Sequence, residues 1–396
     1  MAEQETWTGH VLDGAVTTQA LDQVHRRIGR SFHRREMRER ARRYMAGLLG
    51  QVPRKNSWQL AEALGEAGPQ GVQRLLTDAG WDAEAVRDDL RGYVVEQLGD
   101  RASGVLVVDE TGFLKKGAKS AGVARQYSGT AGRRENQQIG VFLLYASERG
   151  AAFVDRALYL PEGWTADATR RAEAHIPPEV AFATKGDLAR TMLARAFAAD
   201  IPAGWVVGDT VYGSDELRGW LEGQDRAYVL AVPSTHAMWS RGRARTVAEL
   251  AAAVPAHAWA RLSAGEGSQG PRWYDWAWIR LPYADVAAGR TQWLLVRRSL
   301  PDRQQPETPP ELKYYRAYGP EETTLSALVR VAGQRWRIEE AFEQAKGEVG
   351  LDEYEVRRYD AWARHITLAL LAHATLEVTR AHLTQPAQPT ALKGEA

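Results

Sequence analysis

Two short apolar runs that each end at an aspartate constrain the fold of this chain more than any other feature. The run VLVV at 105–108 is followed by Asp109, and the run WVVG at 205–208 is followed by Asp209. Short runs of this kind, rich in β-branched residues, are typical of strands buried inside a sheet. Functional side chains gather where such strands end, because the backbone pairing stops there and the side chains face a cleft.

Further strand and helix patterns surround these two runs. Strands are predicted at 140–147, 152–160 and 228–232, and helices at 185–198 and 214–222. The early strands follow one another closely and can pair antiparallel, whereas the later ones alternate with helices, which favours parallel pairing through right-handed crossovers. The sequence therefore predicts an α/β fold with a mixed five-stranded sheet flanked by helices, which is the ribonuclease H-like arrangement.

The composition is that of a soluble globular protein, with 396 residues of which 44% are apolar and 26% charged. The chain has no cysteine, which excludes thiolate metal sites and disulfide scaffolds. The longest apolar stretches fall short of a membrane span, and the first residues lack the basic and apolar segments of a secretory signal. We therefore expect a cytoplasmic protein with no membrane partner.

Changes of pattern along the chain predict five segments. They are a helical domain at 1–100, the first part of the core at 101–239, a β-rich insertion at 240–320, the last part of the core at 321–383 and a disordered tail at 384–396. Ser57 and Asp82 are predicted N-caps in the helical domain. The insertion is predicted from alternating patterns rich in tryptophan and tyrosine, and the tail from its proline and threonine content.

One segment of the helical domain is strongly basic. Residues 26–43 contain nine arginines against Glu36 and Glu39, in a chain whose net charge is only +1. A local excess of this kind favours a polyanion partner. The alternative is a solvated helix face that carries ion pairs such as Glu36–Arg40.

Asp109 and Asp209 have the placement expected of metal ligands. Mg²⁺ prefers oxygen ligands and usually takes one or two carboxylates together with substrate phosphate. Two such ions, about 4 Å apart, can activate a nucleophile and stabilise the leaving oxygen in a phosphoryl displacement. Taken singly, each aspartate could be a turn or N-cap residue; together, after two core strands, they favour a metal site.

A third carboxylate lies in the segment RWRIEEAFEQAK at 335–346. Arg335, Glu339 and Lys346 are four and seven residues apart, which places them near one face of a helix. A carboxylate flanked by two phosphate-binding cations suits a site of DNA strand transfer. The alternative is an exposed helix whose charges pair with one another.

These residues resemble the bacterial insertion-sequence transposases of the DDE class. The resemblance is carried by VLVVDETGFLKKG at 105–117, WVVGDTVYG at 205–213 and the segment 335–346, and it covers roughly 100–375. The last segment matches the family pattern Tyr-(2)-Arg-(3)-Glu-(6)-Lys except at the tyrosine, whose position is taken by Ala332. The segment at 122–143 also resembles the corresponding part of these transposases.

The resemblance implies a ribonuclease H-like catalytic core with a β insertion, which cuts transposon ends and joins them to target DNA. It implies two Mg²⁺ ions, with Mn²⁺ as a substitute, held by a catalytic triad of Asp109, Asp209 and Glu339. Arg335 and Lys346 would contact DNA phosphate. Glu340 and Glu343 are rivals of Glu339, but neither reproduces the spacing from arginine to lysine.

The resemblance also makes the helical domain a candidate for binding DNA ends. The predicted DNA contacts outside the segment 335–346 are Lys115, Lys116, Arg125, Arg34, Arg35, Arg38 and Arg42. For the lysines the alternative is a solvated turn. The expected partners are double-stranded DNA, as transposon ends and target, and a second copy of the chain on DNA, with the protein on the bacterial nucleoid in the cytoplasm.

Three functions remain open from the sequence. The first is an active DNA transposase, the second a metal-dependent nuclease that cuts without joining, and the third a catalytically inactive DNA-binding protein derived from a transposase. An intact set of three carboxylates favours the first two, because a protein that only binds DNA has no use for converging carboxylates.

Overall fold

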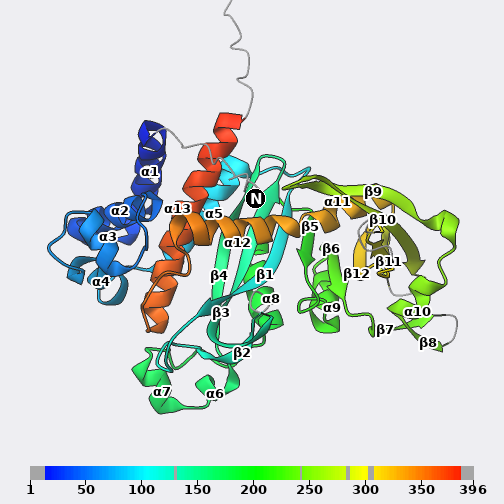
Figure 1. The fold of residues 1–396 in the computed structure, drawn as a ribbon, viewed down its shortest axis with the longest axis horizontal. Coiled ribbons are helices and arrows are strands. Elements are labelled where there is room, and N and C mark those ends of the chain that lie inside the picture. Colours follow the sequence, from blue (N-terminus) through cyan, green and yellow to red (C-terminus); the bar gives the residue numbers. More distant parts are fainter. Residues whose placement is uncertain (1–13, 129–131, 241–242, 282–285, 302–306, 385–396) are drawn as a thin grey trace, which may run out of the picture.

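A sheet of ten strands runs through the molecule and carries the predicted core strands in its first half. The structure is a computed structural model, which describes residues 14–128, 132–240, 243–281, 286–301 and 307–384 (Figure 1). The strands of the sheet are β1 (Val105–Leu114), β2 (Ala124–Ser128), β3 (Arg133–Ser147), β4 (Gly150–Tyr159), β5 (Trp205–Gly208), β6 (Ala227–Val232), β9 (Ala260–Gly267), β10 (Gly270–Leu281), β11 (Arg290–Arg298) and β12 (Leu312–Pro320).

The core strands have the order β4-β3-β1-β5-β6. Strand β1 pairs antiparallel with β3 and parallel with β5, and β5 pairs parallel with β6. The predicted mixed five-stranded sheet flanked by helices is therefore confirmed. The short strand β2, which the sequence analysis did not predict, pairs with the first residues of β3 and extends one edge of the sheet.

Strand β1 is longer than the predicted run, because it continues past Asp109 to Leu114. Its pairing with β5 stops at Val108 opposite Gly208, but its antiparallel pairing with β3 continues to Leu114. Asp109 and Asp209 therefore both lie just past the last pair of parallel residues. At this end of the β1–β5 pair the parallel strands separate, and side chains from both can converge.

The predicted β-rich insertion continues the core sheet. Strand β12 pairs antiparallel with β6, and the order β12-β11-β10-β9 completes the sheet. One face of this extension has its own apolar cluster, in which Met238, Val247, Leu250, Leu294 and Val296 are buried. The hairpin of β7 (Ala237–Ser240) and β8 (Arg243–Thr246) and helix α10 (Val247–Ala252) supply the other side of this cluster.

The first hundred residues are helical where the structure describes them. The helices are α1 (Gly14–Ile28), α2 (Arg35–Leu49), α3 (Ser57–Ala63), α4 (Gln70–Thr77) and α5 (Ala83–Leu98), with a 3₁₀ turn at Gly29–Ser31. Asp82 caps α5 as predicted, but α3 is capped by Asn56, whose side chain accepts hydrogen bonds from the amides of Trp58 and Gln59. The predicted cap Ser57 is the first helical residue.

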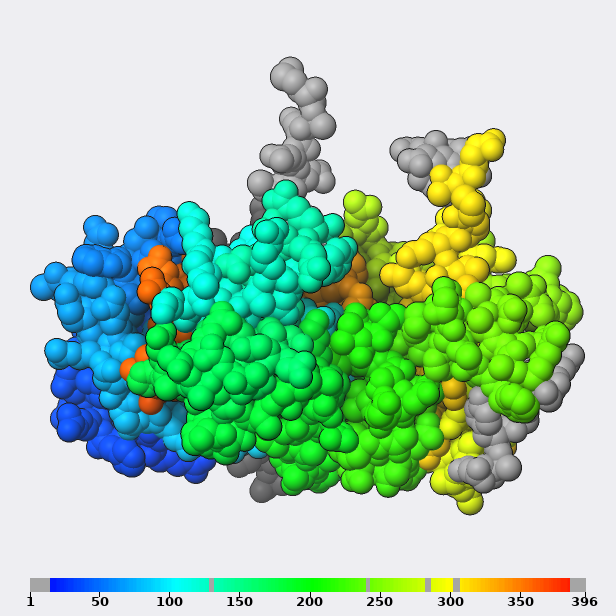
Figure 2. Space-filling view, turned by 90° about the horizontal axis from the view of Figure 1, so that it is seen from below, coloured from blue at the N-terminus to red at the C-terminus, as the bar shows by residue number. Residues whose placement is uncertain are grey.

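Helices α1, α2, α4 and α5 pack on the long helix α13 (Tyr359–Thr384), and α3 packs on α2 and α4, so that the helices share one apolar core with the sheet. Tyr44 of α2 and His365 of α13 are both buried and joined by a hydrogen bond of 2.7 Å. Figure 2 shows the N-terminal helices and the sheet extension at opposite ends of the molecule, with the core strands between them. The boundaries of the five segments remain a prediction.

The helix predicted across 324–347 is divided in two. Two residues separate the end of helix α11 (Leu325–Gly333) from the start of α12 (Trp336–Val349). A Cβ atom at Gly333 would lie 1.9 Å from the carbonyl oxygen of Ala264, so the chain approaches β9 more closely than any other residue type would allow. Arg335 consequently lies at the start of α12, which runs across the sheet (Figure 1).

Helices on the two faces of the sheet approach β1 from opposite sides. Thr111 contacts Lys346 of α12, whereas Glu110 contacts Lys185, the first residue of α8 (Lys185–Ala198). The buried Asp155 of β4 holds α8 in place, because it accepts hydrogen bonds of 2.9 and 3.1 Å from Arg195. The remaining helices are α6 (Glu162–Thr165), α7 (Ala168–Glu173), α9 (Asp215–Gly223) and a 3₁₀ turn at Ala256–Ala258.

None of the helices in the described ranges combines the length and the apolar character needed to cross a lipid bilayer. The predicted tail at 384–396 lies outside the described residues except for Thr384, which ends α13.

Candidate active site

Three carboxylates meet where the parallel pairing of β1 and β5 ends. One carboxylate oxygen from each of Asp109, Glu110 and Asp209 lies within 4.8 Å of the other two. Asp109 and Glu110 come from the middle of β1, where its pairing with β5 has ended, and Asp209 follows β5 directly. Two separate stretches of the chain, a hundred residues apart, therefore supply one acidic cluster.

Glu110 is held in place by two side chains. Its Oε1 atom lies 2.6 Å from the ammonium of Lys185, and its Oε2 atom accepts a 2.5 Å hydrogen bond from the hydroxyl of Tyr212. Tyr212, three residues after Asp209, is completely buried. The Tyr212 hydroxyl and the Lys185 ammonium together fix the direction of the Glu110 carboxylate on the α8 side of the sheet.

Arg335 connects Glu339 to this cluster. Its Nη1 atom donates a 2.9 Å hydrogen bond to Oδ2 of Asp109, and its Nη2 atom donates to Oε1 of Glu339. Arg335 and Glu339 are four residues apart and so face the same side of the chain at the start of α12. The structure thus brings Asp109 and Glu339 to opposite ends of one guanidinium.

Burial and crowding disfavour the charged forms of the two aspartates. Burial raises the pKa of Asp109 to about 7; the guanidinium of Arg335 opposes this rise, and the neighbouring Asp209 adds to it. The pKa of Asp209 is also raised, mainly by burial and then by the charge of Glu110. A set of oxygen donors whose ionisation is held back by desolvation and like charge fits a divalent cation, which would favour the ionised forms.

Lys346 lies farther along α12, on the same side as Arg335. Its ammonium donates a 2.8 Å hydrogen bond to the hydroxyl of Thr111, which is two residues beyond Asp109 and therefore on the same face of β1. Burial lowers the pKa of Lys346. One face of α12 thus presents Arg335, Glu339 and Lys346 along β1.

The chain matches the family described as DDE superfamily endonuclease over residues 27–259, which is more than half of its length. It belongs to this DDE superfamily. A second family, described as Transposase DDE domain, matches residues 181–374. The predicted resemblance to DDE transposases is therefore confirmed, and membership of the superfamily implies dependence on a divalent metal ion, for which the acidic cluster is the candidate.

Similarity to an individual protein also points to the transposases. The chain is 27% identical over 193 residues to a probable transposase for insertion sequence element IS701 from Microchaete diplosiphon. The match covers 48% of this chain and 47% of that protein, so the chain spans about half the length of this relative.

The lysines and the arginine near β1 that were predicted to contact DNA differ in their surroundings. Lys115 is half-buried: its ammonium lies 3.4 Å from the centre of the Tyr354 ring and donates to the Tyr354 carbonyl, and burial lowers its pKa to about 8. Lys116 and Arg125 are exposed. In this DDE protein, Lys115 is thus turned toward the core, while Lys116 and Arg125 are open to a partner.

The arginines of the basic segment at 26–43 also differ in their surroundings. Arg42 forms an ion pair of 2.6 Å with Asp22, and the predicted pair of Glu36 with Arg40 is present at 3.4 Å. Arg34 and Arg35 are exposed, and among the described residues no acidic side chain pairs with them. Arg38 is half-buried and packs against Gly29.

The sequence analysis missed Glu110, Lys185 and Tyr212. Glu110 follows Asp109 directly, and the alternation of a strand places neighbouring side chains on opposite faces, which argues against a shared site. Lys185 and Tyr212 lie at the start of a helix and in a loop, where a single sequence carries no signal of function. Only the arrangement of β1, β5 and α8 brings the three residues together.

Proposed function

We propose that this protein is a DNA transposase that cuts the ends of an insertion sequence and joins them to target DNA. The observation that supports this most is the acidic cluster of Asp109, Glu110 and Asp209, to which Arg335 connects Glu339 by bonding to both Asp109 and Glu339. These carboxylates come from three stretches of the chain, and the superfamily to which the chain belongs provides the chemistry.

In this proposal, Asp109, Asp209 and Glu339 hold two Mg²⁺ ions, which Mn²⁺ can replace. When bound, such ions activate the attacking oxygen and stabilise the leaving oxygen of an in-line phosphoryl displacement. Glu110 is a fourth carboxylate at the same place. Lys185 and Tyr212 hold it in one direction, so that it adds negative charge beside Asp209 without rotating freely.

The cations on α12 position the DNA strand. Arg335 and Lys346 lie on one face of the helix, on either side of Glu339 along the chain. Their side chains contact β1 at Asp109 and Thr111, so each can reach a phosphate held next to the carboxylates. Phosphate contacts of this kind fix the register of a substrate and carry no sequence information.

Other exposed cations extend the DNA surface. Lys116 follows β1, Arg125 lies in β2, and Arg34 and Arg35 lie at the start of α2, where the half-buried Arg38 follows them. The substrate is double-stranded DNA, as transposon ends and target. Because two ends must be joined to one target, two copies of the chain act together on DNA, and the protein works on the nucleoid in the cytoplasm.

The experiment uses the full chain and a linear DNA that carries the inverted repeats bracketing its gene. With Mg²⁺, cut ends and joined products are expected; with EDTA, neither. Cut ends without joined products would indicate a nuclease, and binding without cutting under any divalent metal would indicate a protein that only binds DNA.

A further inference from the structure

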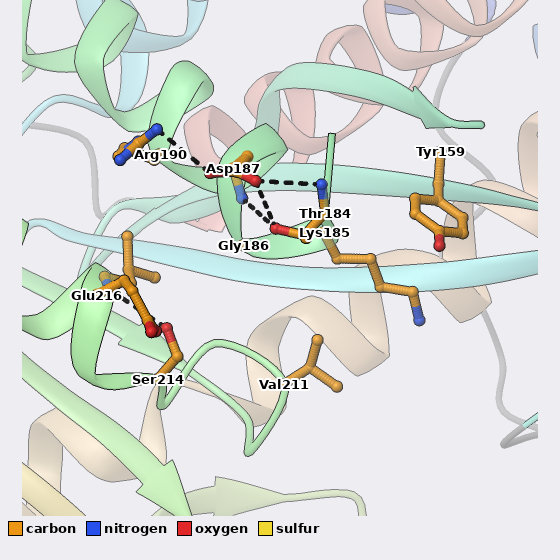
Figure 3. A pocket seen from close by; sticks show the side chains of 10 residues that line it. Tyr159, Thr184, Lys185, Gly186, Asp187, Arg190, Val211, Ser214 and Glu216 are labelled. Atoms are coloured by element: carbon orange, nitrogen blue, oxygen red, sulfur yellow. Dashed lines mark hydrogen bonds and ion pairs between the residues drawn. The ribbon is translucent and has the colours of Figure 1, made fainter. Parts of the chain in front are cut away.

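A pocket of about 530 Å³ opens beside the carboxylates on the α8 side of the sheet. Its walls come from β4, α8, the loop after β5 and the start of α9 (Figure 3). We call it the α8–α9 pocket; the residues that matter for its chemistry are Tyr159, Lys185, Gly186, Arg190, Val211 and Ser214. No DNA contact was predicted from the sequence for any of them.

Two residues connect the α8–α9 pocket directly to the candidate active site. Lys185 lines the pocket and contacts Glu110 with its ammonium. Val211 lines it as well and follows Asp209 by two residues, and its amide donates to the Asp209 carboxylate. A group in this pocket would therefore be next to the carboxylates, on the side opposite Arg335.

The acidic side chains that line the pocket are bonded to neighbouring residues of the pocket itself. The carboxylate of Asp187 is engaged by the hydroxyl of Thr184 at 2.7 Å and by Arg190 at 3.2 Å, and Glu216 bonds to Ser214. Figure 3 shows the Lys185 side chain extending away from these acidic groups, to a place below Tyr159 in the view. Of the two cations that line the pocket, Lys185 is the one that contacts the carboxylate cluster, through Glu110.

The other surfaces of the pocket suit a nucleotide. The ring of Tyr159 lies 5.9 Å from the Lys185 ammonium, and Val211 is 41% exposed, so an aromatic and an aliphatic surface stand beside a cation. Single-stranded nucleic acid is commonly held by this combination, in which the cation binds phosphate and the flat or apolar surface contacts the base or sugar.

A second pocket, of about 390 Å³, lies on the other side of Asp209. It is lined by Asp209 and Arg335 together with Ser234, Lys313 and Tyr315. The carboxylate cluster thus lies between two pockets. A strand whose reacting phosphate sits on the carboxylates has to leave in both directions, and the two pockets provide room on both sides.

We propose that the α8–α9 pocket holds the nucleotide next to the reacting phosphate, with its own phosphate on Lys185. This rests on the proposed function. The nucleotide can belong to the DNA that flanks the transposon end or to the target strand, because both have the same sugar-phosphate backbone. A defect in cutting identifies the flanking strand, and a defect confined to the joining of pre-cut ends identifies the target strand.

Gly186 provides the test, because it lines the pocket and is the second residue of α8. A Cβ atom there meets only the hydroxyl of Thr184, at 3.7 Å, so a side chain fits without displacing the backbone. Gly186→Glu places an acid in the pocket, and acids are favourable in the first turn of a helix. Gly186→Gln supplies the same bulk without charge, and Gly186→Lys supplies the opposite charge.

The measurement is single-turnover cutting of a labelled transposon end and joining of pre-cut ends, with thermal unfolding of each variant to verify folding. We expect Gly186→Glu to slow cutting or joining about fivefold or more relative to Gly186→Gln, since like charges about 4 Å apart repel by about 1 kcal/mol even in water. Gly186→Lys should be at least as fast as Gly186→Gln.

Equal rates for the glutamate, glutamine and lysine variants in both reactions would overturn the proposal. An inactive wild-type protein in the same experiment would instead contradict the proposed function, so the two failures are distinguishable.

Discussion

Asp109→Asn should make the metal-free protein more stable at pH 8. Burial raises the pKa of this carboxyl from 3.8 to about 7, so the folded protein resists its ionisation while the unfolded chain does not. Asparagine occupies the same space and removes the charge. It also keeps an oxygen that can accept the hydrogen bond from Arg335, which now reaches Asp109 Oδ2 at 2.9 Å.

The size and the pH dependence follow from the two pKa values. Below a pH of about 4 the carboxyl is protonated in both states and contributes nothing. Between about 4 and 7 it ionises only in the unfolded chain, so the stability of the wild type falls as the pH rises; above about 7 the loss is complete. The gap between 3.8 and about 7 corresponds to at most about 4 kcal/mol of unfolding free energy.

The assay is urea unfolding at pH 4.5 and pH 8 in the presence of EDTA. We expect Asp109→Asn to gain a few kcal/mol at pH 8 and much less at pH 4.5. Asp200→Asn is the matched control, because the side chain of Asp200 is 85% exposed and its backbone conformation, with φ of 49°, is tolerated by asparagine. A loss of stability at pH 8, or a gain independent of pH, would refute the reasoning.

Three further outcomes are expected. Replacing Arg34 and Arg35 by glutamine should reduce the slope of DNA affinity against salt by about 2, measured by fluorescence anisotropy, since each neutralised phosphate adds close to one. Lys346→Ala should slow single-turnover cutting by on the order of 100-fold, because small displacements of a reacting group are costly, with Gln344→Ala nearly silent and gel-shift affinity little changed. Glu110→Gln should weaken Mn²⁺ binding to the DNA-free protein in calorimetry, because it removes one charge of the acidic cluster.

The core of the fold could be predicted because its strands are short apolar runs separated by clear turns or helices. The order of these runs was enough to indicate the mixed sheet. The extent of β1 could not be predicted, because the four residues after Val108 are polar or small and extend the strand only through their pairing with β3. The break before α12 depends on the close approach of Gly333 to β9, which is a tertiary contact.

The candidate site was predictable only in part, for a similar reason. The spacing of Arg335, Glu339 and Lys346 indicates one helix face, which follows from helix geometry alone. The inward turn of Lys115 toward Tyr354 depends on the packing of the segment after α12. The role of Glu110 depends on α8 and on the loop after β5, which come close to it only in the folded chain.

Cutting of a labelled transposon end by carboxylate variants tests the central claim most directly. Asp209→Asn and Glu339→Gln should each abolish cutting in Mg²⁺ while end binding by gel shift stays close to wild type, since both would remove a metal ligand without touching the DNA-binding surface. Glu340→Gln, one residue along α12, should cut like the wild type. Cutting at the wild-type rate by Asp209→Asn or Glu339→Gln would contradict the assignment of these carboxylates to the active site.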